Sequence, residues 1–300
     1  MNRFACRSRA NPYSGLFSPW RAPHTNNLQS IGSLVQLEGD GMMERLHCGD
    51  LQMAYRWAGE PGGPVLLLSH SLGASGLMWE PQIGRLGKRF RLLIPDHRGH
   101  GESSVPEQIY SIEDFGRDLL AMLDQLGLQR VHFCGLSLGG MIGMWMGQHA
   151  AERIDRLVLC NTAAKIIDPR LLRGRLRLIR DNGLEAIAES VIDRWFSREF
   201  QSARPDEIDA ARRMFLATSS TGYVNASHAV CDLDLRDSLA SIACPTLVIA
   251  GKNDLATPVT WNEAIAAAIR GSELKVLDAA HLSNIEAAEA FNQSVESFLC

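Results

Sequence analysis

The 300-residue sequence lacks several features that would place it in a broad class of protein. It has no apolar run close to the roughly 18 residues that a membrane-spanning helix needs, so we expect no membrane partner. Its formal net charge of −4 is too small to indicate nucleic-acid binding. Gly-rich nucleotide-binding motifs are also missing, and we predict no cofactor. The 46% apolar and 21% charged residues indicate a globular protein with an ample core.

The seven cysteines are scattered, and no two of them have the spacing of a metal site. Three of them, Cys134, Cys160 and Cys244, fall in apolar runs, where a buried free thiol is the ordinary interpretation. A disulfide framework is therefore not expected. Unpaired thiols fit a reducing compartment, so the sequence predicts a cytoplasmic protein.

Acidic residues are absent before Glu38, whereas arginines recur there among Ser, Pro and Asn. Two interpretations remain open for residues 1–42. A disordered or over-extended start is favoured, because Met42 and Met43 directly precede the first strand-like segment. A targeting segment is the alternative, since transit peptides are rich in Arg and Ser and poor in acids. Both interpretations make residues 1–42 an extension of the folded domain.

From about residue 43 onward, strand-like and helix-like segments alternate. Gly49-Asp50 predicts a hairpin turn, Ser111 predicts the N-cap of a helix that stops at Gly127, and Ser283 to Glu286 has the form of a capping box opening the last helix. Strands are predicted at residues 65–69, 90–95, 131–136, 154–160, 246–250 and 273–277, and the continuous apolar runs at 65–69 and 90–95 are typical of buried parallel strands. This alternation predicts an α/β fold with a mainly parallel central sheet flanked by helices.

One block of the chain breaks the alternation. Residues 165–237 contain helix-like segments rich in Arg, Leu, Ala and Glu, and no convincing strand. The block falls between two predicted core strands, above the sheet edge where active-site loops gather. We therefore predict a helical cap at 165–237 and a core made of residues 43–164 and 238–300.

A G-x-S-x-G pentapeptide, Gly135 to Gly139, lies between a predicted buried strand and a predicted helix. A serine on such a sharp turn has its hydroxyl pushed clear of the backbone, and small neighbours relieve the crowding. Ser137 would also sit at a helix N-terminus, where free N–H groups favour developing negative charge. The pentapeptide alone is a weak signal, so the interpretation depends on partners further along the chain.

Two such partners occur in the order that this arrangement requires. Asp254 and His281 each lie four residues past the end of a predicted strand, so all three side chains should meet at one sheet edge. Singly, Asp254 has the ordinary interpretation of a turn residue, and His281 that of a loop residue. Together they predict a triad with Ser137 as nucleophile, His281 as base and Asp254 as the acid that orients it.

The segment from His70 to Gly73 follows another predicted strand. A loop at this place can direct the backbone N–H of Leu72 toward a tetrahedral oxyanion, alongside the N–H of Leu138. A simple glycine turn is the alternative.

Asp96, His97 and His100 form a dense cluster that suggests a metal site. No further ligand group with metal spacing accompanies them, so we predict no metal. We expect instead a structural loop in which Asp96 and Arg98 hydrogen-bond neighbouring backbone.

Residues 43–300 resemble the α/β-hydrolase family and, within it, the 3-oxoadipate enol-lactonases. The general likeness rests on the segments around Leu72, Arg98 and Ser137, and the lactonase likeness on the tail and part of the cap. These segments are Ser71-Leu72-Gly73 with Met78-Trp79-Glu80-Pro81-Gln82, Asp96 with Arg98-Gly99-His100-Gly101, Gly135 to Met141, Arg194-Trp195-Phe196, and Ala279 to Glu286. His70 departs from the asparagine that these lactonases often have.

The resemblance implies acyl transfer through an acyl-enzyme, with 3-oxoadipate enol-lactone opened to 3-oxoadipate in aromatic-compound catabolism. That substrate carries a carboxylate, so Arg194 is a candidate to bind it, with Trp195 as a pocket wall. Cap packing and a solvated arginine are the alternative for this pair. Other possible functions are a carboxylesterase, a carbon–carbon bond hydrolase and a non-catalytic small-molecule receptor. A homo-oligomer is possible.

Overall fold

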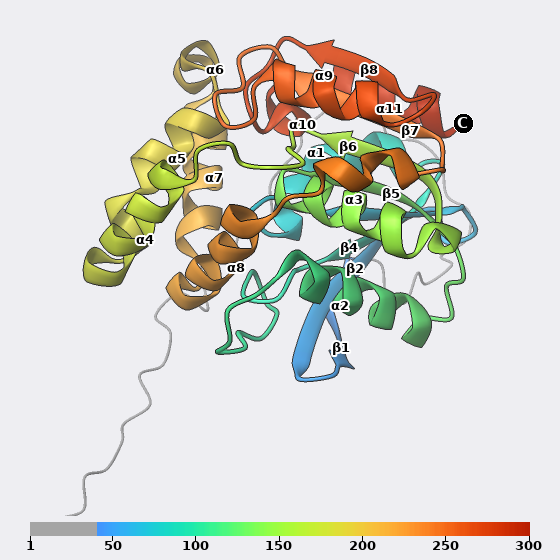
Figure 1. Cartoon of the computed structure of the whole chain (residues 1–300), viewed down its shortest axis with the longest axis horizontal. Coiled ribbons are helices and arrows are strands. Elements are labelled where there is room, and N and C mark those ends of the chain that lie inside the picture. Colours follow the sequence, from blue (N-terminus) through green and yellow to red (C-terminus); the bar gives the residue numbers. More distant parts are fainter. Residues whose placement is uncertain (1–40) are drawn as a thin grey trace, which may run out of the picture. The chain divides into compact units, whose positions relative to one another are not determined.

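The computed structural model describes residues 41–300, so the predicted extension at 1–42 lies almost entirely outside the described residues. These residues form an eight-stranded sheet in the order β1-β2-β4-β3-β5-β6-β7-β8 (Figure 1). The first pairings, β1 with β2 and β2 with β4, are antiparallel, and all the others are parallel. The strands are Glu44–Cys48, Leu51–Gly59, Val65–Ser69, Arg91–Pro95, Val131–Leu136, Ile154–Cys160, Thr246–Gly251 and Glu273–Leu277. The predicted α/β fold with a mainly parallel sheet is confirmed.

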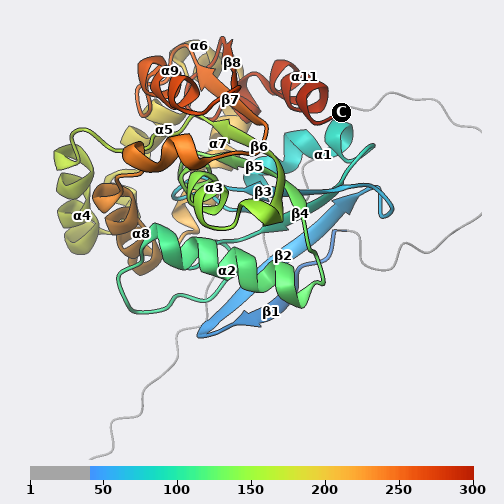
Figure 2. The same ribbon diagram turned by 45° about the vertical axis from the view of Figure 1, so that its right-hand side comes forward.

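Helices cover both faces of the sheet (Figures 1 and 2). Side chains alternate along a strand, so a central strand directs apolar side chains to both faces, and each face needs a covering layer. On β5, Phe133 packs into the core under α2 (Ile112–Gln125), α3 (Leu138–His149) and α9 (Val259–Ala268). The next residue, Cys134, packs into the opposite core with α1 (Glu80–Leu86) and α11 (Ala288–Leu299). Every residue of β5 is buried, as expected for a central strand.

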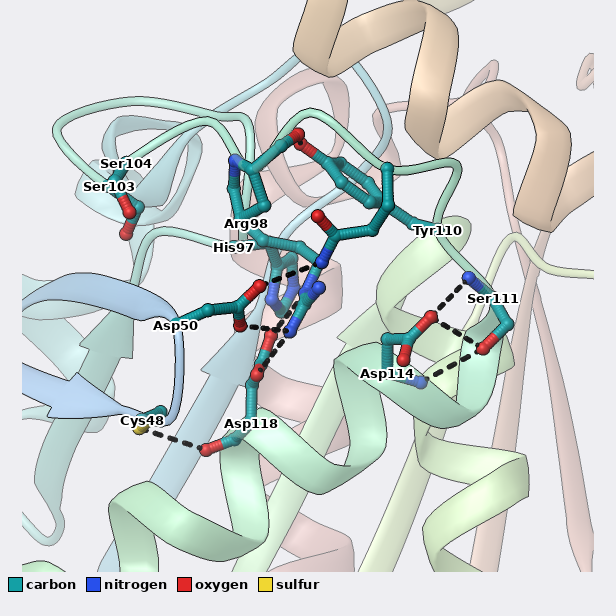
Figure 3. Close-up of polar contacts among 12 residues, drawn as sticks. Cys48, Asp50, His97, Arg98, Ser103, Ser104, Tyr110, Ser111, Asp114 and Asp118 are labelled. Carbon is teal, nitrogen blue, oxygen red and sulfur yellow. Dashed lines mark hydrogen bonds and ion pairs between the residues drawn. The ribbon is translucent and has the colours of Figure 1, made fainter.

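The predicted start of α2 is confirmed. The Ser111 hydroxyl accepts a hydrogen bond from the Asp114 amide at 3.2 Å, and the Asp114 carboxylate accepts one from the Ser111 amide at 2.7 Å (Figure 3). This reciprocal capping satisfies two of the free N–H groups at the helix N-terminus. Gly127, with a φ of 67°, lies just beyond the helix end.

The predicted capping box at Ser283 is wrong. The segment forms two helices, α10 (Ser283–Glu286) and α11, separated at Ala287, and no side chain caps α10. The Ser283 hydroxyl donates instead to Asn161 at 2.6 Å, and Glu286 accepts from the Ala280 and Ser197 amides. Contacts with distant segments therefore prevail over the local capping pattern.

The segment between β6 and β7 is helical (Figure 1). Its helices are α4 (Arg170–Asn182), α5 (Ala188–Trp195), α6 (Arg198–Ala203), α7 (Pro205–Leu216) and α8 (Ser220–Asp232). We refer to residues 165–237 as the helical insertion. Gly222 of α8 approaches Gly99 so closely that a Cβ on Gly222 would lie 2.0 Å from the Gly99 carbonyl oxygen. In the part of the chain that the structure describes, no helix is long and apolar enough to cross a membrane.

The loop after β4 is held by two carboxylates. Asp96 accepts hydrogen bonds from the Gly76 and Glu102 amides at 2.7 and 2.9 Å, as predicted. Arg98 does not bind neighbouring backbone, and that prediction is wrong. Its guanidinium forms a two-pronged ion pair with the buried Asp118 of α2, at 2.6 and 2.7 Å (Figure 3).

Candidate active site

Ser137 occupies a strained turn between β5 and α3. Its φ of 58° lies in the left-handed region, which residues other than glycine rarely adopt. The turn is held from β6, because the Ser137 amide donates to the Cys160 carbonyl at 2.9 Å and the Thr162 hydroxyl donates to the Ser137 carbonyl at 2.7 Å. Gly139 has no room for a side chain, since a Cβ would lie 2.0 Å from the Ser69 carbonyl oxygen. The turn therefore depends on the strained backbone of Ser137 and on a glycine two residues after it.

Asp254 and His281 lie together at the same sheet edge, in the loops after β7 and β8. The His281 Nδ1 is 2.8 Å from Asp254 Oδ2, and the two residues are only 3% and 4% exposed. This contact puts the proton on Nδ1 and leaves Nε2 as the basic nitrogen. Among residues 41–300, the Ser137 hydroxyl has no hydrogen-bond partner. The hydrogen bond between a nucleophile and its base often forms fully only when substrate binds.

The Asp254 carboxylate is surrounded by donors. Besides His281, its Oδ2 accepts from the Thr257 hydroxyl at 2.7 Å and the Asn161 amide at 3.0 Å. Its Oδ1 accepts from the backbone amides of Ala256 and Thr257 at 2.7 and 3.0 Å. Burial alone would raise the pKa of Asp254, but His281 and the Thr257 and Asn161 hydrogen bonds outweigh it and lower that pKa. The carboxylate is thus kept charged beside the imidazole.

Asn161 is a site residue that the sequence analysis missed. It directly follows β6, is fully buried, and has a φ of 44°. Its Nδ2 also donates to the Ala280 carbonyl at 3.2 Å, and its Oδ1 accepts from the Ser283 hydroxyl at 2.6 Å. The signal that identified Asp254, a polar residue just after a buried strand, was available for Asn161 as well.

The two predicted oxyanion amides belong to loops that leave neighbouring parallel strands. In the pairing of β3 with β5, Ser69 lies opposite Gly135. Leu138 is the first residue of α3, so its N–H has no carbonyl to bind within the helix. The backbone hydrogen bonds of residues 41–300 include none donated by Leu72. Both amides are thus available to a ligand.

Buried histidines hold the loop that carries Leu72. His100 Nε2 accepts from the Gly73 amide at 3.1 Å, and His70 Nε2 accepts from the His97 amide at 2.9 Å. An imidazole nitrogen that accepts a hydrogen bond carries no proton, so these rings must be neutral. Burial lowers the pKa of His70 to about 4 and that of His100 to about 3, which keeps them so at neutral pH.

Arg194 and Trp195, at the end of α5, lie beside the triad loops. Arg194 Nη2 donates to the Leu255 carbonyl at 3.1 Å, one residue beyond Asp254. The Trp195 carbonyl accepts from the Leu282 amide at 3.0 Å, one residue beyond His281. Trp195 is buried, whereas Arg194 is half-buried.

Two segments that carry the family resemblance, Met78 to Gln82 and Ala279 to Glu286, contact each other. The Asn284 side-chain amide donates to Gln82 Oε1 at 3.1 Å and to the Met78 carbonyl at 2.8 Å. The Gln82 amide donates in return to the Asn284 carbonyl at 2.8 Å and to Asn292 at 3.1 Å. These amides are buried and bind one another, so this part of the pattern stabilises the loops around the site.

Comparisons with known proteins identify the family of the chain. The family profile described as alpha/beta hydrolase fold matches residues 64–288. The chain is 36% identical to 3-oxoadipate enol-lactonase 2 of Acinetobacter baylyi, over 85% of this chain and 96% of that protein. Its structure is similar to that of an enol-lactonase from Burkholderia xenovorans LB400, with a TM-score of 0.84 and 39% identity over 85% of this chain and 99% of that one.

A thermophilic esterase from Thermogutta terrifontis is also similar, with a TM-score of 0.80 and 30% identity over 86% of this chain and 98% of that one. Lactones are cyclic esters, so these relatives share one reaction class. The chain belongs to the α/β-hydrolase family, and it is a hydrolase of ester-type bonds that is similar to 3-oxoadipate enol-lactonases.

Proposed function

We propose that the protein is a serine-dependent lactonase that opens 3-oxoadipate enol-lactone to 3-oxoadipate in the breakdown of aromatic compounds. The observation that carries the proposal is the buried 2.8 Å contact of Asp254 with His281, at the sheet edge where Ser137 occupies its strained turn. The enol-lactone is the substrate that the relatives' names favour.

In the proposed first step, the Ser137 Oγ attacks the lactone carbonyl while His281 Nε2 takes its proton. Asp254 holds the imidazole in place and stabilises the cation that forms. The backbone amides of Leu72 and Leu138 bind the oxyanion of the tetrahedral intermediate. The ring C–O bond then breaks, the His281 imidazolium gives its proton to the departing oxygen, and an acyl-enzyme that carries an enol remains.

The leaving group makes this ring opening comparatively easy, because an enolate is less basic than an ordinary alkoxide. In the second step, His281 takes a proton from water, which attacks the acyl-enzyme; the bond to Ser137 breaks, His281 returns the proton to the serine oxygen, and the carboxylic acid is released. The enol then converts to the ketone, so the product is a 3-oxo acid. No cofactor is required for any of these steps.

The helical insertion is proposed to act as the cap of the site, over a core made of residues 43–164 and 238–300. Arg194 then supplies a cation for the substrate carboxylate, and Trp195 forms part of the pocket wall. These roles are supported by two contacts. Arg194 binds Leu255, the residue after Asp254, and Trp195 binds Leu282, the residue after His281.

The decisive experiment compares kcat/KM on the enol-lactone with kcat/KM on simple aryl esters. We expect the lactone to be preferred by at least about tenfold, and mass spectrometry of the product to identify 3-oxoadipate. The similar thermophilic esterase makes carboxylesterase the second candidate. A higher kcat/KM on the aryl esters would establish that alternative, and ligand binding without any turnover would indicate a receptor.

A further inference from the structure

Two arginines of the helical insertion lie close to each other. Arg175 of α4 donates through its Nη2 to the Ser190 carbonyl of α5 at 3.4 Å. Ser190 lies one helical turn before Arg194, on the same side of α5. The Arg175 guanidinium therefore reaches the turn that carries Arg194, whose own guanidinium lies against Leu255 at the triad loop.

Neither guanidinium has an acidic ion-pair partner among the described residues 41–300. Other arginines of the helical insertion do have one: Arg173 binds Asp232 and Arg212 binds Glu189. Burial and the charge of Arg175 both lower the pKa of Arg194. Two neighbouring cations that are partly removed from water repel each other, and an anion between them would relieve that repulsion.

Tyr223 of α8 lies beside the same two arginines. Burial raises the pKa of Tyr223, whereas Arg175 and Arg194 are near enough to lower it in part. The ring also touches the loop that carries Leu72, since a Cβ on Gly73 would lie 2.9 Å from it. Tyr223 thus contacts the loop after β3 and Arg194 the loop of Asp254, the two loops that flank the proposed reaction centre, and Arg175 lies beside both side chains.

We propose that Arg175, Arg194 and the Tyr223 hydroxyl form a carboxylate subsite. The ligand is a short substrate that has a free carboxylate in addition to the ester bond that is cleaved. A guanidinium presents parallel N–H donors that match the two oxygens of a carboxylate, and a phenol adds a further donor. The inference rests on the proposed function for placing the cleaved carbonyl at Ser137. Arg175, from a different helix than Arg194, is the new member of the site.

The subsite can be tested by binding alone, with adipate, a six-carbon dicarboxylate, titrated calorimetrically into the full chain. Arg175→Gln should raise the dissociation constant about ten- to hundredfold, the effect of losing a charge-assisted hydrogen bond. Arg175→Lys, which keeps the charge and loses the fork, should give a smaller increase. The matched control is Arg177→Gln, an exposed arginine of the same helix, which should change the constant less than about twofold.

Equal dissociation constants for the Arg175→Gln and Arg177→Gln variants would overturn the subsite, and so would a failure of adipate to bind the unsubstituted protein. Circular dichroism and thermal unfolding of each variant show whether it is folded. If adipate binding depends on Arg175 but no enol-lactone is hydrolysed, the subsite stands and the proposed function fails. If the lactone is hydrolysed but the dissociation constant of adipate does not depend on Arg175, the proposed function stands and the subsite fails.

Discussion

The side-chain amide of Asn161 donates a hydrogen bond of 3.0 Å to Asp254, on the same carboxylate oxygen that binds His281. Asn161 directly follows β6, whereas Asp254 lies after β7 and His281 after β8. One buried amide thus ties together the loops of three successive strands. Its second donor bond, to Ala280, and its acceptor bond from Ser283 leave it a single orientation.

We predict that Asn161→Gly lowers kcat/KM by about tenfold or more, because one donor to Asp254 is lost. Glycine accepts the φ of 44° at this position, so the substitution adds no backbone strain. The lost hydrogen bond no longer lowers the pKa of Asp254, so the acid limb of the pH–rate profile should move to higher pH. Steady-state kinetics between pH 4 and 9 measure both effects.

The control for this prediction is Ser283→Ala, which leaves the Asn161 amide in place and removes only the hydroxyl that orients it. Its loss of kcat/KM should be smaller. A reduced rate with an unmoved acid limb in Asn161→Gly would show that Asn161 contributes packing alone.

Ser137→Ala should abolish turnover, with a loss of at least about a thousandfold, because the proposed nucleophile is removed. Alanine keeps the Cβ of the strained turn. Among residues 41–300 the Ser137 hydroxyl has no hydrogen-bond partner, so its removal leaves no polar group unsatisfied. The melting temperature should therefore change by no more than about 2 °C. Activity near that of the unsubstituted protein would refute the assignment of the nucleophile.

Asp118→Asn should lower the free energy of unfolding by about 3 kcal/mol, because it leaves the buried Arg98 with only the more distant and exposed Asp50, at 3.9 Å, as a counter-charge. Urea denaturation measures the change. The matched control is Asp114→Asn on the same helix, which weakens only the capping contact with Ser111 and should cost about 1 kcal/mol (Figure 3). Equal effects of the two variants would show that the ion pair contributes no more than the cap.

Stability should fall as the pH decreases from about 6.5 toward 4. The folded protein holds His70 and His100 neutral, with pKa values of about 4 and 3, whereas histidines of the unfolded chain titrate near 6.5. Below pH 6.5 the unfolded state therefore takes up protons first, and the free energy of unfolding falls by on the order of a few kcal/mol. Urea denaturation at a series of pH values measures this slope.

A His100→Gln variant should have a shallower dependence on pH in this range, because one of the buried neutral imidazoles is gone. A free energy of unfolding that stays constant between pH 7 and 5 in the unsubstituted protein would contradict the explanation.

Much of the fold was predictable because its signals are local. Apolar runs predicted the central parallel strands, and the Ser111 pattern predicted the start of α2. The same kind of local pattern misled at Ser283, where the hydroxyl binds Asn161 instead of capping its own helix. The prediction that Arg98 binds neighbouring backbone was wrong for the same reason, since its partner Asp118 lies on a separate helix.

The α/β alternation, the strained serine turn and the chain order of Ser137, Asp254 and His281 could be predicted from the chain alone, because each depends on neighbours along the chain or on strand ends. Three contacts exist only in the folded molecule: Asn161 with Asp254, Gln82 with Asn284, and Arg175 with the helical turn that carries Arg194. These contacts join side chains from separate elements. Their partners depend on how helices and loops pack across the sheet edge, and that packing leaves no periodic pattern in the chain.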